Sequence, residues 1–476
     1  MMAERRCPNE RLRALLREAG WTHEAFARAV NSVGSEIGLS LAYDRSSVSH
    51  WLAGTRPNAP VPQLIVEALT RRTGRAMTVS AAGFEEPPAQ PPPSSQRPRR
   101  PQEPPAAPRH SGAGRTGGTL NALAVLSRQD TDPVTRAPLL LRPFRAAISH
   151  VPAWTEPEGA PPGPLTAERL RVGQSEVTVL RGAVRFFASS MGAHGGAHAR
   201  VALAACIADT AVPWLRAPGP RDVRDTLRTE TARLAFVLAR MHADMAGHGL
   251  AQRYLRLAME LANQTRDRAT WAVALRAIGA QSLALGHHRT ALHCVEAAVE
   301  ALPAHAPHAV RAFTLAQLAL TRAATGEKQA ALTALTAAER SGERSWERPG
   351  DRPPPDGGPF AHYPPAALAF QTAETLYRLG QLTAAYRALE RSLRHRAPTD
   401  RRGIALTLAR QGEILLETGQ LEEACATWRE FLRVGDGLRS HTVSSAVQSM
   451  RAGLTPYRGH PALHGLHPET RKPAAR

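Results

Sequence analysis

Residues 247–268, GHGLAQRYLRLAMELANQTRDR, carry a pattern that returns several times in the C-terminal half of the chain. Small residues stand at fixed spacing in this stretch, where Ala251 and Ala258 flank the larger Leu255. A helix with this pattern has an apolar face that it cannot bury alone, so it needs neighbouring copies to pack against. The pattern therefore predicts a stack of helix pairs with one continuous core.

Five copies can be set in one register, each with a small residue in its first helix and three packing residues in its second. The copies are Ala239, Ala251, Leu255 and Ala258; Gly279, Ala291, Val295 and Ala298; Ala319, Ala331, Leu335 and Ala338; Ala373, Ala385, Leu389 and Ser392; and Gly412, Ala424, Trp428 and Phe431. Four copies also carry a turn glycine between their helices, at Gly286, Gly326, Gly380 and Gly419. Small residues let two helices approach closely, and glycine adopts the left-handed turn. The pattern resembles the tetratricopeptide repeat, with a period of about 40 residues in place of the usual ~34.

Composition favours an all-α fold, because alanine and leucine dominate the apolar residues and aromatic residues make up only 5% of the 476 positions. The formal net charge of +19 suits a nucleic-acid partner. Arginine is spread widely, however, and lysine occurs only at Lys328 and Lys472, so the charge is a weak indicator. Four separated cysteines without a CxxC pair indicate reduced thiols in a cytoplasm. No signal peptide or membrane span is expected, and therefore no membrane partner.

Residues 1–86 read as a separate helical unit. Helices are expected at residues 11–19, at 22–30 with Thr22 as the N-cap, at 45–53 after a cap at Asp44 or Ser46, and at 61–73. The order of a Thr-capped helix, a short polar helix ending in Trp-Leu, and a following Arg-Pro resembles the helix-turn-helix of phage-repressor-type regulators. The residues that carry this resemblance are WTHEAFARAVN and DRSSVSHWLAGTRP.

The third helix has the composition of a DNA-recognition helix. Short polar residues on its exposed face would reach base edges in the major groove, and apolar residues on the other face would anchor it. The polar set is Arg45, Ser46, Ser47, Ser49 and His50, the anchors are Val48, Trp51 and Leu52, and Thr22 and Arg56 are candidates for phosphate contacts. A solvated polar helix face without a DNA partner is the competing interpretation.

One departure from the helix-turn-helix pattern concerns the spacing of the second and third helices. A tight turn of about 3–4 residues usually joins them, whereas residues 32–43 lie between them here. Either the second helix is longer than expected or the loop is an insertion, so the docking angle of the recognition helix is open. This departure favours the alternative function, a protein-interaction scaffold whose degenerate helix-turn-helix no longer binds DNA.

The remaining segments have less pattern. Residues 87–118 are rich in proline, arginine and glycine and are expected to be a disordered linker. Residues 119–228 lead into the repeats, with short helices expected at 120–126 and 138–147 and a helix pair expected from 177–191 and 200–215. The repeats are expected over 229–454, with a loop insertion at 341–365, and residues 455–476 read as a disordered tail.

Neither a metal site nor an enzyme is expected. His194 and His198 stand four residues apart, but further ligands are scarce nearby. His287, His288 and His293 surround a repeat turn, where turn hydrogen bonds and solvent exposure are the expected roles. The sequence has no P-loop, no GxGxxG after a strand, no GxSxG and no HExxH. We therefore expect no catalytic residues, no cofactor and no metal.

The whole order resembles actinobacterial transcriptional regulators that join a helix-turn-helix to C-terminal tetratricopeptide repeats. Some members of that group resemble negative regulators of differentiation and antibiotic production. The resemblance implies a cytoplasmic regulator that binds double-stranded DNA as a homodimer through its repeats, with a peptide or protein effector as a further partner. Where such proteins often read Asp-x-x-x-Gly-Gly-Gly-His, this chain has Ser-Met-Gly-Ala-His-Gly-Gly-Ala-His, so the role of the missing acidic residue is not transferred.

Overall fold

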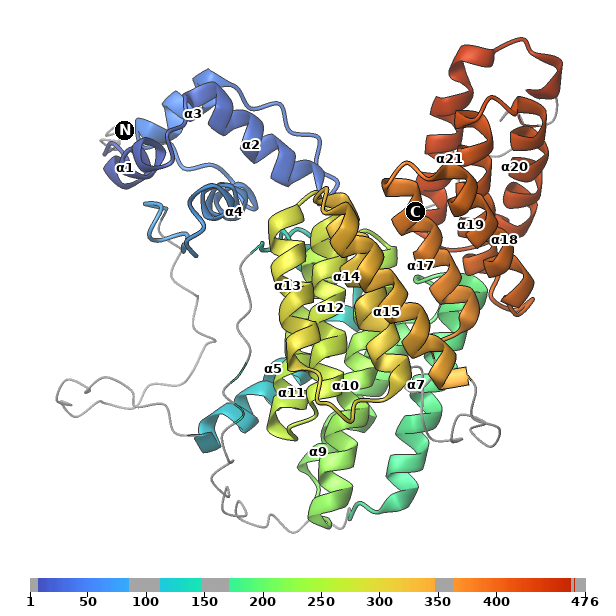
Figure 1. Cartoon of the computed structure of the whole chain (residues 1–476). Helices are drawn as coiled ribbons and strands as arrows, with labels where there is room; N and C mark the ends of the chain where they lie inside the picture. The colour runs from blue at the N-terminus through green and yellow to red at the C-terminus, as the bar shows by residue number, and fades with distance from the viewer. Residues whose placement is uncertain are drawn as a thin grey trace.

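The structure is a computed structural model that describes residues 7–84, 112–146, 152, 154, 171–346, 363–463 and 466, with backbone only for 112–116. Within these residues the chain is all-helical and has no strand, as the composition predicts. Figure 1 shows a small N-terminal group of helices beside a larger helical body. Most of the predicted linker, the segment 155–170 and the end of the predicted tail lie outside the described residues.

The N-terminal unit consists of α1 (Glu10–Glu18), α2 (His23–Ser35), α3 (Arg45–Leu52) and α4 (Val61–Thr73). Thr22 caps α2 as predicted, because its hydroxyl accepts a hydrogen bond of 3.2 Å from the Ala25 amide. A core of its own holds the unit together, with Leu12, Phe26 and Leu64 fully buried in it. Helix α2 runs five residues beyond the predicted end at Val30.

The segment between the N-terminal unit and the helix pairs is more helical than its sequence indicated. Helix α5 spans Gly112–Thr131, so it begins inside the predicted linker, and α6 spans Pro133–Leu140 in place of the expected 138–147. Buried Leu120, Leu123 and Leu126 anchor α5, and each residue added to an existing helix gains a hydrogen bond. The Asp132 carboxylate caps α6 by accepting hydrogen bonds from the Val134 and Thr135 amides. A capping aspartate followed directly by proline, here Pro133, usually marks the start of a helix.

Helix α7 (Gln174–His194) is followed by a second helical stretch. That stretch comprises α8 (Arg200–Cys206), a π-helical turn at Ile207–Ala211 and α9 (Val212–Arg216). Both helices were predicted from sequence, but they do not form a simple pair. Helix α7 packs against α10 (Arg221–Asp244), whereas α8 packs against α5. Helix α10 begins eight residues ahead of the predicted start of the repeats.

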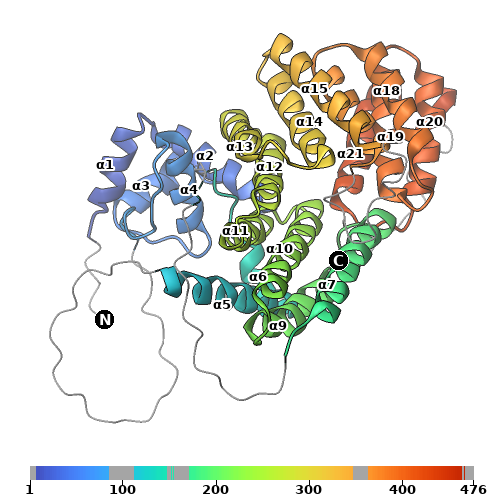
Figure 2. The same ribbon diagram turned by 60° about the horizontal axis from the view of Figure 1, so that its bottom comes forward.

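Within the described residues, the body contains five antiparallel helix pairs. They are α10 with α11 (His248–Gln264), α12 (Arg268–Ala284) with α13 (His288–Ala301), α14 (His308–Ala324) with α15 (Lys328–Trp346), α17 (Pro365–Arg378) with α18 (Leu382–His395), and α19 (Arg401–Glu417) with α20 (Leu421–Gly435). A last helix, α21 (His441–Leu454), packs on α19. Figure 2 shows the pairs following one another along a curve, with α10, α12 and α14 toward its inner side.

The small residues of the repeating pattern lie where the two helices of a pair meet. Every alanine of the register is at most 1% exposed, and the larger Leu255, Val295 and Trp428 are equally buried. Gly412 shows why these positions need small residues, because a Cβ atom built there would lie 2.2 Å from the Trp428 indole nitrogen. The turn glycines Gly286, Gly326, Gly380 and Gly419 all have φ between +73° and +86°. The first pair turns instead at Ala246, which has φ +60°.

The curve of helix pairs is closed by contacts between its first and last members. The carboxylate of Asp244, at the end of α10, accepts hydrogen bonds from Arg402 at 2.7 Å, Ser440 at 2.9 Å and the Gly196 amide at 2.8 Å. The Arg439 backbone lies so close to Gly195 that a Cβ there would be 2.6 Å from the Arg439 carbonyl oxygen. Gly195 and Gly196 therefore allow the close approach of these segments.

A buried carboxylate joins α5 to the body. Asp130 is fully buried and contacts Arg200 at 2.5 Å, His242 at 2.7 Å and the Tyr254 hydroxyl at 3.0 Å. Burial alone would raise the pKa of Asp130, but the hydrogen bonds and charges of His242, Arg200 and Tyr254 lower it overall. Burial lowers the pKa of His242, although its hydrogen bond with the Asp130 carboxylate acts in the opposite direction.

Two further segments differ from the sequence-based expectation. Helix α15 continues through Ser341 to Trp346, into the predicted loop insertion, and the Trp346 indole donates to the Tyr363 carbonyl at 3.1 Å. The start of the predicted tail packs on the last helices, because Leu463 and Leu466 are buried there. Among the described helices none has the length and apolar character needed to cross a membrane.

Candidate nucleic-acid interface

Helix α3 is positioned by a capping box at its N-terminus. The Asp44 carboxylate accepts from the Ser47 amide and hydroxyl, both at 2.9 Å, and from the Ser46 hydroxyl at 2.7 Å. The Ser47 hydroxyl lies 3.5 Å from the Asp44 amide and completes the box. The hydrogen bonds from Ser47 and Ser46 lower the pKa of Asp44 to about 2. Of the two caps that the sequence allowed, the structure uses Asp44.

The opposite face of α3 is held by aromatic packing. Val48, Trp51 and Leu52 are buried, as predicted for the anchors. The Trp51 ring meets Phe26 edge-on at 6.2 Å and Tyr43 at 5.0 Å between ring centroids. Edge-to-face pairs of this kind add to the stabilisation that burial provides. The polar face of α3 therefore has a fixed direction relative to α2.

Both explanations of the long spacing between α2 and α3 apply. Helix α2 extends to Ser35, and a loop of residues 36–44 then leads back to the start of α3. Asn31 ties the end of this loop to α2, because its amide donates to the Tyr43 carbonyl at 2.8 Å and its oxygen accepts from the Tyr43 amide at 3.0 Å. Gly34 lets the loop pass closely, since a Cβ there would lie 2.4 Å from the Leu41 Cδ1 atom.

The predicted contact residues divide into two groups. Arg45, His50 and Arg56 are exposed, and their side chains form no ion pair or hydrogen bond with any residue that the structure describes. The serine hydroxyls are already engaged, since Ser49 donates to the Arg45 carbonyl at 3.0 Å and Ser46 and Ser47 bind Asp44. Ser47 is half-buried and belongs to the cap, so it differs from the expected exposed residue. Thr22 uses its hydroxyl to cap α2.

The Asp44 cap gives α3 a defined dependence on pH. A carboxyl with a lowered pKa stabilises the folded state above its unfolded pKa of about 4. This contribution is lost as the pH falls toward the folded value of about 2. We expect the Ser47 amide to be protected from hydrogen exchange at pH 5 to 7 and to lose protection below about pH 3. In the Asp44→Ala variant it should exchange rapidly throughout, and equal protection in both proteins would contradict the capping role.

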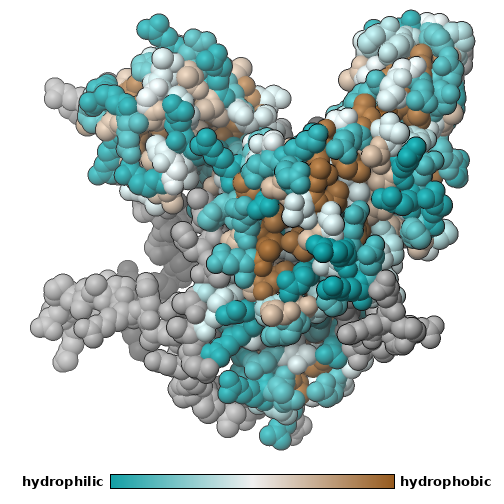
Figure 3. Space-filling model, viewed as in Figure 1, coloured by the Kyte–Doolittle hydropathy of each residue, from teal (hydrophilic) through white to brown (hydrophobic). Residues whose placement is uncertain are grey.

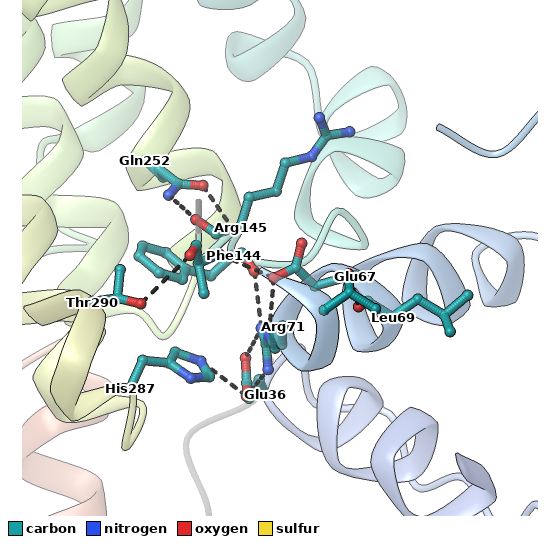
Figure 4. Close-up of polar contacts among 11 residues, drawn as sticks. Glu36, Glu67, Leu69, Arg71, Phe144, Arg145, Gln252, His287 and Thr290 are labelled. Atoms are coloured by element: carbon teal, nitrogen blue, oxygen red, sulfur yellow. Dashed lines mark hydrogen bonds and ion pairs between the residues drawn. The ribbon is translucent and has the colours of Figure 1, made fainter. Parts of the chain in front are cut away.

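A short strap connects the N-terminal unit to the helical body. This strap, residues 141–146, follows α6 and lies between α4 and the first two helix pairs, as Figure 4 shows. Arg71 of α4 binds both carboxylate oxygens of Glu36, at 2.6 and 2.8 Å, and donates to the Phe144 carbonyl at 2.9 Å. The buried carboxylate of Glu67 accepts from Arg71 at 2.8 Å and from the Ala146 amide at 3.0 Å.

The other side of the strap is bound by the body. Gln252 of α11 forms two hydrogen bonds with the Arg145 backbone, at 2.9 and 2.6 Å. Thr290 donates to the Ala146 carbonyl at 3.5 Å. Gly249 is required beneath the strap, because a Cβ there would lie 1.8 Å from the Arg142 carbonyl oxygen. The strap thus joins the two parts of the chain through backbone hydrogen bonds on both sides.

His287 of the body contacts the N-terminal unit directly. Its Nε2 lies 3.6 Å from Glu36, and its ring stacks on Phe144 with 6.2 Å between centroids. Burial would raise the pKa of Glu36, but His287 and Arg71 lower it overall. The sequence predicted turn hydrogen bonding and solvent exposure for His287. Its main side-chain contacts are instead with Glu36 and Phe144. No local signal in the sequence pairs it with Glu36, because 251 positions separate them.

The junction leaves the polar face of α3 accessible. The body and the strap contact the N-terminal unit at Glu36, just after α2, and at Glu67 and Arg71 of α4. Figures 1 and 2 both show α2 and α4 between α3 and the body. Within the part of the chain that the structure describes, Arg45, His50 and Arg56 therefore face solvent.

Histidines elsewhere do not assemble a metal site in the described part of the chain. His194 and His198 lie close, with 4.4 Å between ring centroids. No group of three or more His, Cys, Asp or Glu side chains placed to hold a metal ion occurs among the described residues.

The fold and the junction define an all-α protein in which a compact N-terminal unit is fastened to a curved stack of helix pairs. The sequence profile of the family described as SP15 N-terminal domain matches residues 12–85, which span α1 to α4 and the segment that follows. No curated protein sequence matches the chain.

Proposed function

We propose that this protein is a DNA-binding transcriptional regulator, whose N-terminal unit is a helix-turn-helix that reads an operator. The observation that carries this proposal is α3, a capped helix with a buried apolar face and an exposed polar face. Arg45 and His50 project from that face, and Arg56 follows it in the next turn. Arginine is the side chain best suited to guanine edges and to phosphates. Thr22 would bring the N-terminus of α2 close to a phosphate.

We propose that the helix pairs are tetratricopeptide-like repeats that serve as a binding scaffold. The support is the burial of every register position at a close contact between paired helices. A stack of this kind provides an extended surface for a partner protein, a peptide or a second copy of the chain. A homodimer in the cytoplasm would place two reading helices on a palindromic site and supply the contact area that one unit lacks.

A protein-interaction scaffold without DNA binding is the second candidate. One observation favours it: the hydroxyls of Ser46, Ser47 and Ser49 are satisfied within α3, so few side chains on this face are ready to read bases. The two candidate functions predict a different dependence of DNA affinity on salt concentration. A chain that neutralises several phosphates loses DNA affinity steeply as salt rises, whereas a scaffold has no such affinity to lose.

The deciding experiment is genome-wide capture of DNA bound to the tagged full chain, compared with a copy that lacks residues 1–86. Discrete sites that share a palindromic motif and disappear in the truncated copy would support the regulator. No enrichment in either copy would contradict it and favour the scaffold.

Once an operator is known, the His50→Glu variant tests the polar face of α3. We expect at least a tenfold loss of operator affinity, because an acidic side chain would face the groove and a good base contact contributes about 1–3 kcal/mol. The melting temperature should not change, since His50 is exposed. Arg378→Glu, an exposed charge change in the body, is the matched control. Equal affinities of His50→Glu and the wild-type chain would remove His50 from the contact set.

A further inference from the structure

Helices α15, α17 and α18 surround a pocket of about 380 Å³. The three helices belong to two successive helix pairs, and α17 packs against both of the others. Pockets that hold small molecules range from about 300 to 1,000 Å³, so this one has room for a small ligand. None of its described lining residues belongs to the candidate interface on α3 or to the strap.

The floor of the pocket is apolar and comes from α17, where Leu368 and Ala369 are buried side chains of the body. Trp346, at the end of α15, adds a half-buried ring whose N–H is already bonded to the Tyr363 carbonyl, at 3.1 Å. Gly342 lets α15 pass closely over this floor, because a Cβ there would lie 2.8 Å from the Leu368 Cδ2 atom. The floor and the Trp346 ring thus form a fixed apolar surface.

Two carboxylates of α15 line one side of the pocket. Glu339 and Glu343 are one helical turn apart, so their side chains lie on the same face of the helix. Neither forms an ion pair with a residue that the structure describes, and the Thr372 hydroxyl donates to Glu339 at 3.4 Å. Burial and the nearby Glu343 raise the pKa of Glu339, although Arg391 and Thr372 act in the opposite direction. A positive charge in the pocket would therefore stabilise the ionised form of Glu339.

Basic side chains of α18 line the other side. Arg391 and His395 are also one turn apart, and both are exposed at the rim of the pocket. Within the described part of the chain, neither forms an ion pair with an acidic residue. Opposite charges therefore line the two sides of the pocket without pairing across it. The pocket has a negative side on α15 and a positive side on α18.

This separation of charge distinguishes the pocket from the rest of the surface. Figure 3 shows apolar side chains gathered in a strip across the middle of the body, so an apolar surface alone does not mark a ligand site on this protein. A ligand with a single positive charge would be opposed by Arg391, and one with a single negative charge by the two glutamates. Charge complementarity therefore selects a small molecule that carries both charges.

We propose that the pocket binds a free amino acid with a large apolar side chain. The ammonium group would pair with Glu339 and Glu343, the carboxylate would pair with Arg391, and the side chain would cover Leu368 and the Trp346 ring. A volume near the lower end of the range for small-molecule sites favours one amino acid over a longer peptide. Because α15, α17 and α18 alone supply the site, the proposal does not depend on DNA binding.

The first test is the melting temperature of the full chain with each of the twenty free L-amino acids at about 5 mM, because a ligand of the folded state raises this temperature. We expect a rise with at least one of leucine, isoleucine, methionine, phenylalanine and tryptophan, and none with glycine, aspartate or lysine. No rise with any large apolar amino acid, or an equal rise with glycine, would overturn the proposal.

Calorimetric titration then compares the best amino acid with two analogues, the amine that lacks its carboxylate and the acid that lacks its ammonium group. Each analogue should bind at least about tenfold more weakly, because charge-assisted hydrogen bonds are lost. Equal affinity of the amine would show a cation site, and equal affinity of the acid would show an anion site. Tighter binding of the dipeptide made from the same amino acid would show a peptide site. Each of these three results would overturn the proposal.

Substitutions on the two sides of the pocket test the direction in which the ligand binds. Glu339→Gln should weaken binding of the amino acid at least about tenfold and should not weaken binding of the acid analogue, which has no ammonium group. Arg391→Gln should weaken binding of the amino acid and of the acid analogue and should not weaken binding of the amine. Glu390→Gln and Arg394→Gln remove exposed charges of α18 outside the described lining and should bind as the wild type does.

Thermal melting without ligand reports whether each variant folds. An unchanged Kd for the amino acid in a folded Glu339→Gln variant would overturn the site, and so would an equal loss of affinity for all three ligands. Because these titrations contain no DNA, their failure would leave the operator experiment unaffected. Failure to find an operator would likewise leave the pocket untouched.

Discussion

Replacing Asp130 with alanine should lower the free energy of unfolding by about 3–5 kcal/mol, because the change leaves a buried charge without its partner. Asp130 is fully buried and joins α5 to α8, α10 and α11 through Arg200, His242 and Tyr254. Arg200 is 9% exposed and its ion pair is with Asp130, so the alanine variant leaves its guanidinium buried without an acidic partner. Thermal or urea unfolding of the full chain, followed by circular dichroism, measures the loss.

Two further variants test whether the unpaired buried charge of Arg200 causes this loss of stability. Asp209→Ala removes an exposed carboxylate from the neighbouring π-helical turn and should change stability by less than about 0.5 kcal/mol. Adding Arg200→Leu to Asp130→Ala should recover part of the loss, since neither charge is then buried. A double variant less stable than Asp130→Ala would contradict the explanation.

The same carboxylate predicts a response to pH. The pKa of Asp130 is lowered in the folded state. Its stabilising contribution is therefore complete above the unfolded value of about 4 and is lost as the pH falls through the folded value. The difference in stability between the wild type and Asp130→Asn should be constant from pH 5 to 7 and shrink at lower pH.

Replacing Trp51 with alanine should unfold the N-terminal unit while the helix pairs stay folded. Trp51 is 4% exposed and packs against Phe26 and Tyr43, and loss of a buried aromatic side chain costs about 3–5 kcal/mol. The unit has its own core, which is separate from the core of the body. Hydrogen exchange of the full chain measures the two parts independently.

We expect residues 7–84 to lose protection in Trp51→Ala, and α12 to α15 to exchange as in the wild type. Ser49→Ala, on the exposed face of the same helix, should retain protection in both parts. Operator binding should be lost together with protection. Normal protection of α2 and α4 in Trp51→Ala would show that the anchoring face of α3 has been wrongly assigned.

Local patterns predicted helices and their ends well where short-range physics decides them. The N-caps at Thr22 and Asp44, the limits of α4 and the four turn glycines follow from side chains within a few residues. Predictions of loops and linkers from polar or glycine-rich composition were less successful. The glycine-containing start of α5 and the polar end of α15 are helical, because each continues a helix whose middle is anchored by buried residues.

The sequence by itself determined the helical class, the register of the helix pairs and the polar and apolar faces of α3, since these depend on spacings of three to four residues. Only the tertiary structure decided which distant groups meet. Asp130 finds His242, Glu36 finds His287, and Asp244 finds Arg402 and Ser440 across more than 100 positions of the chain. The path of the backbone sets such pairings. A charged residue in a sequence does not indicate which distant residue it will contact.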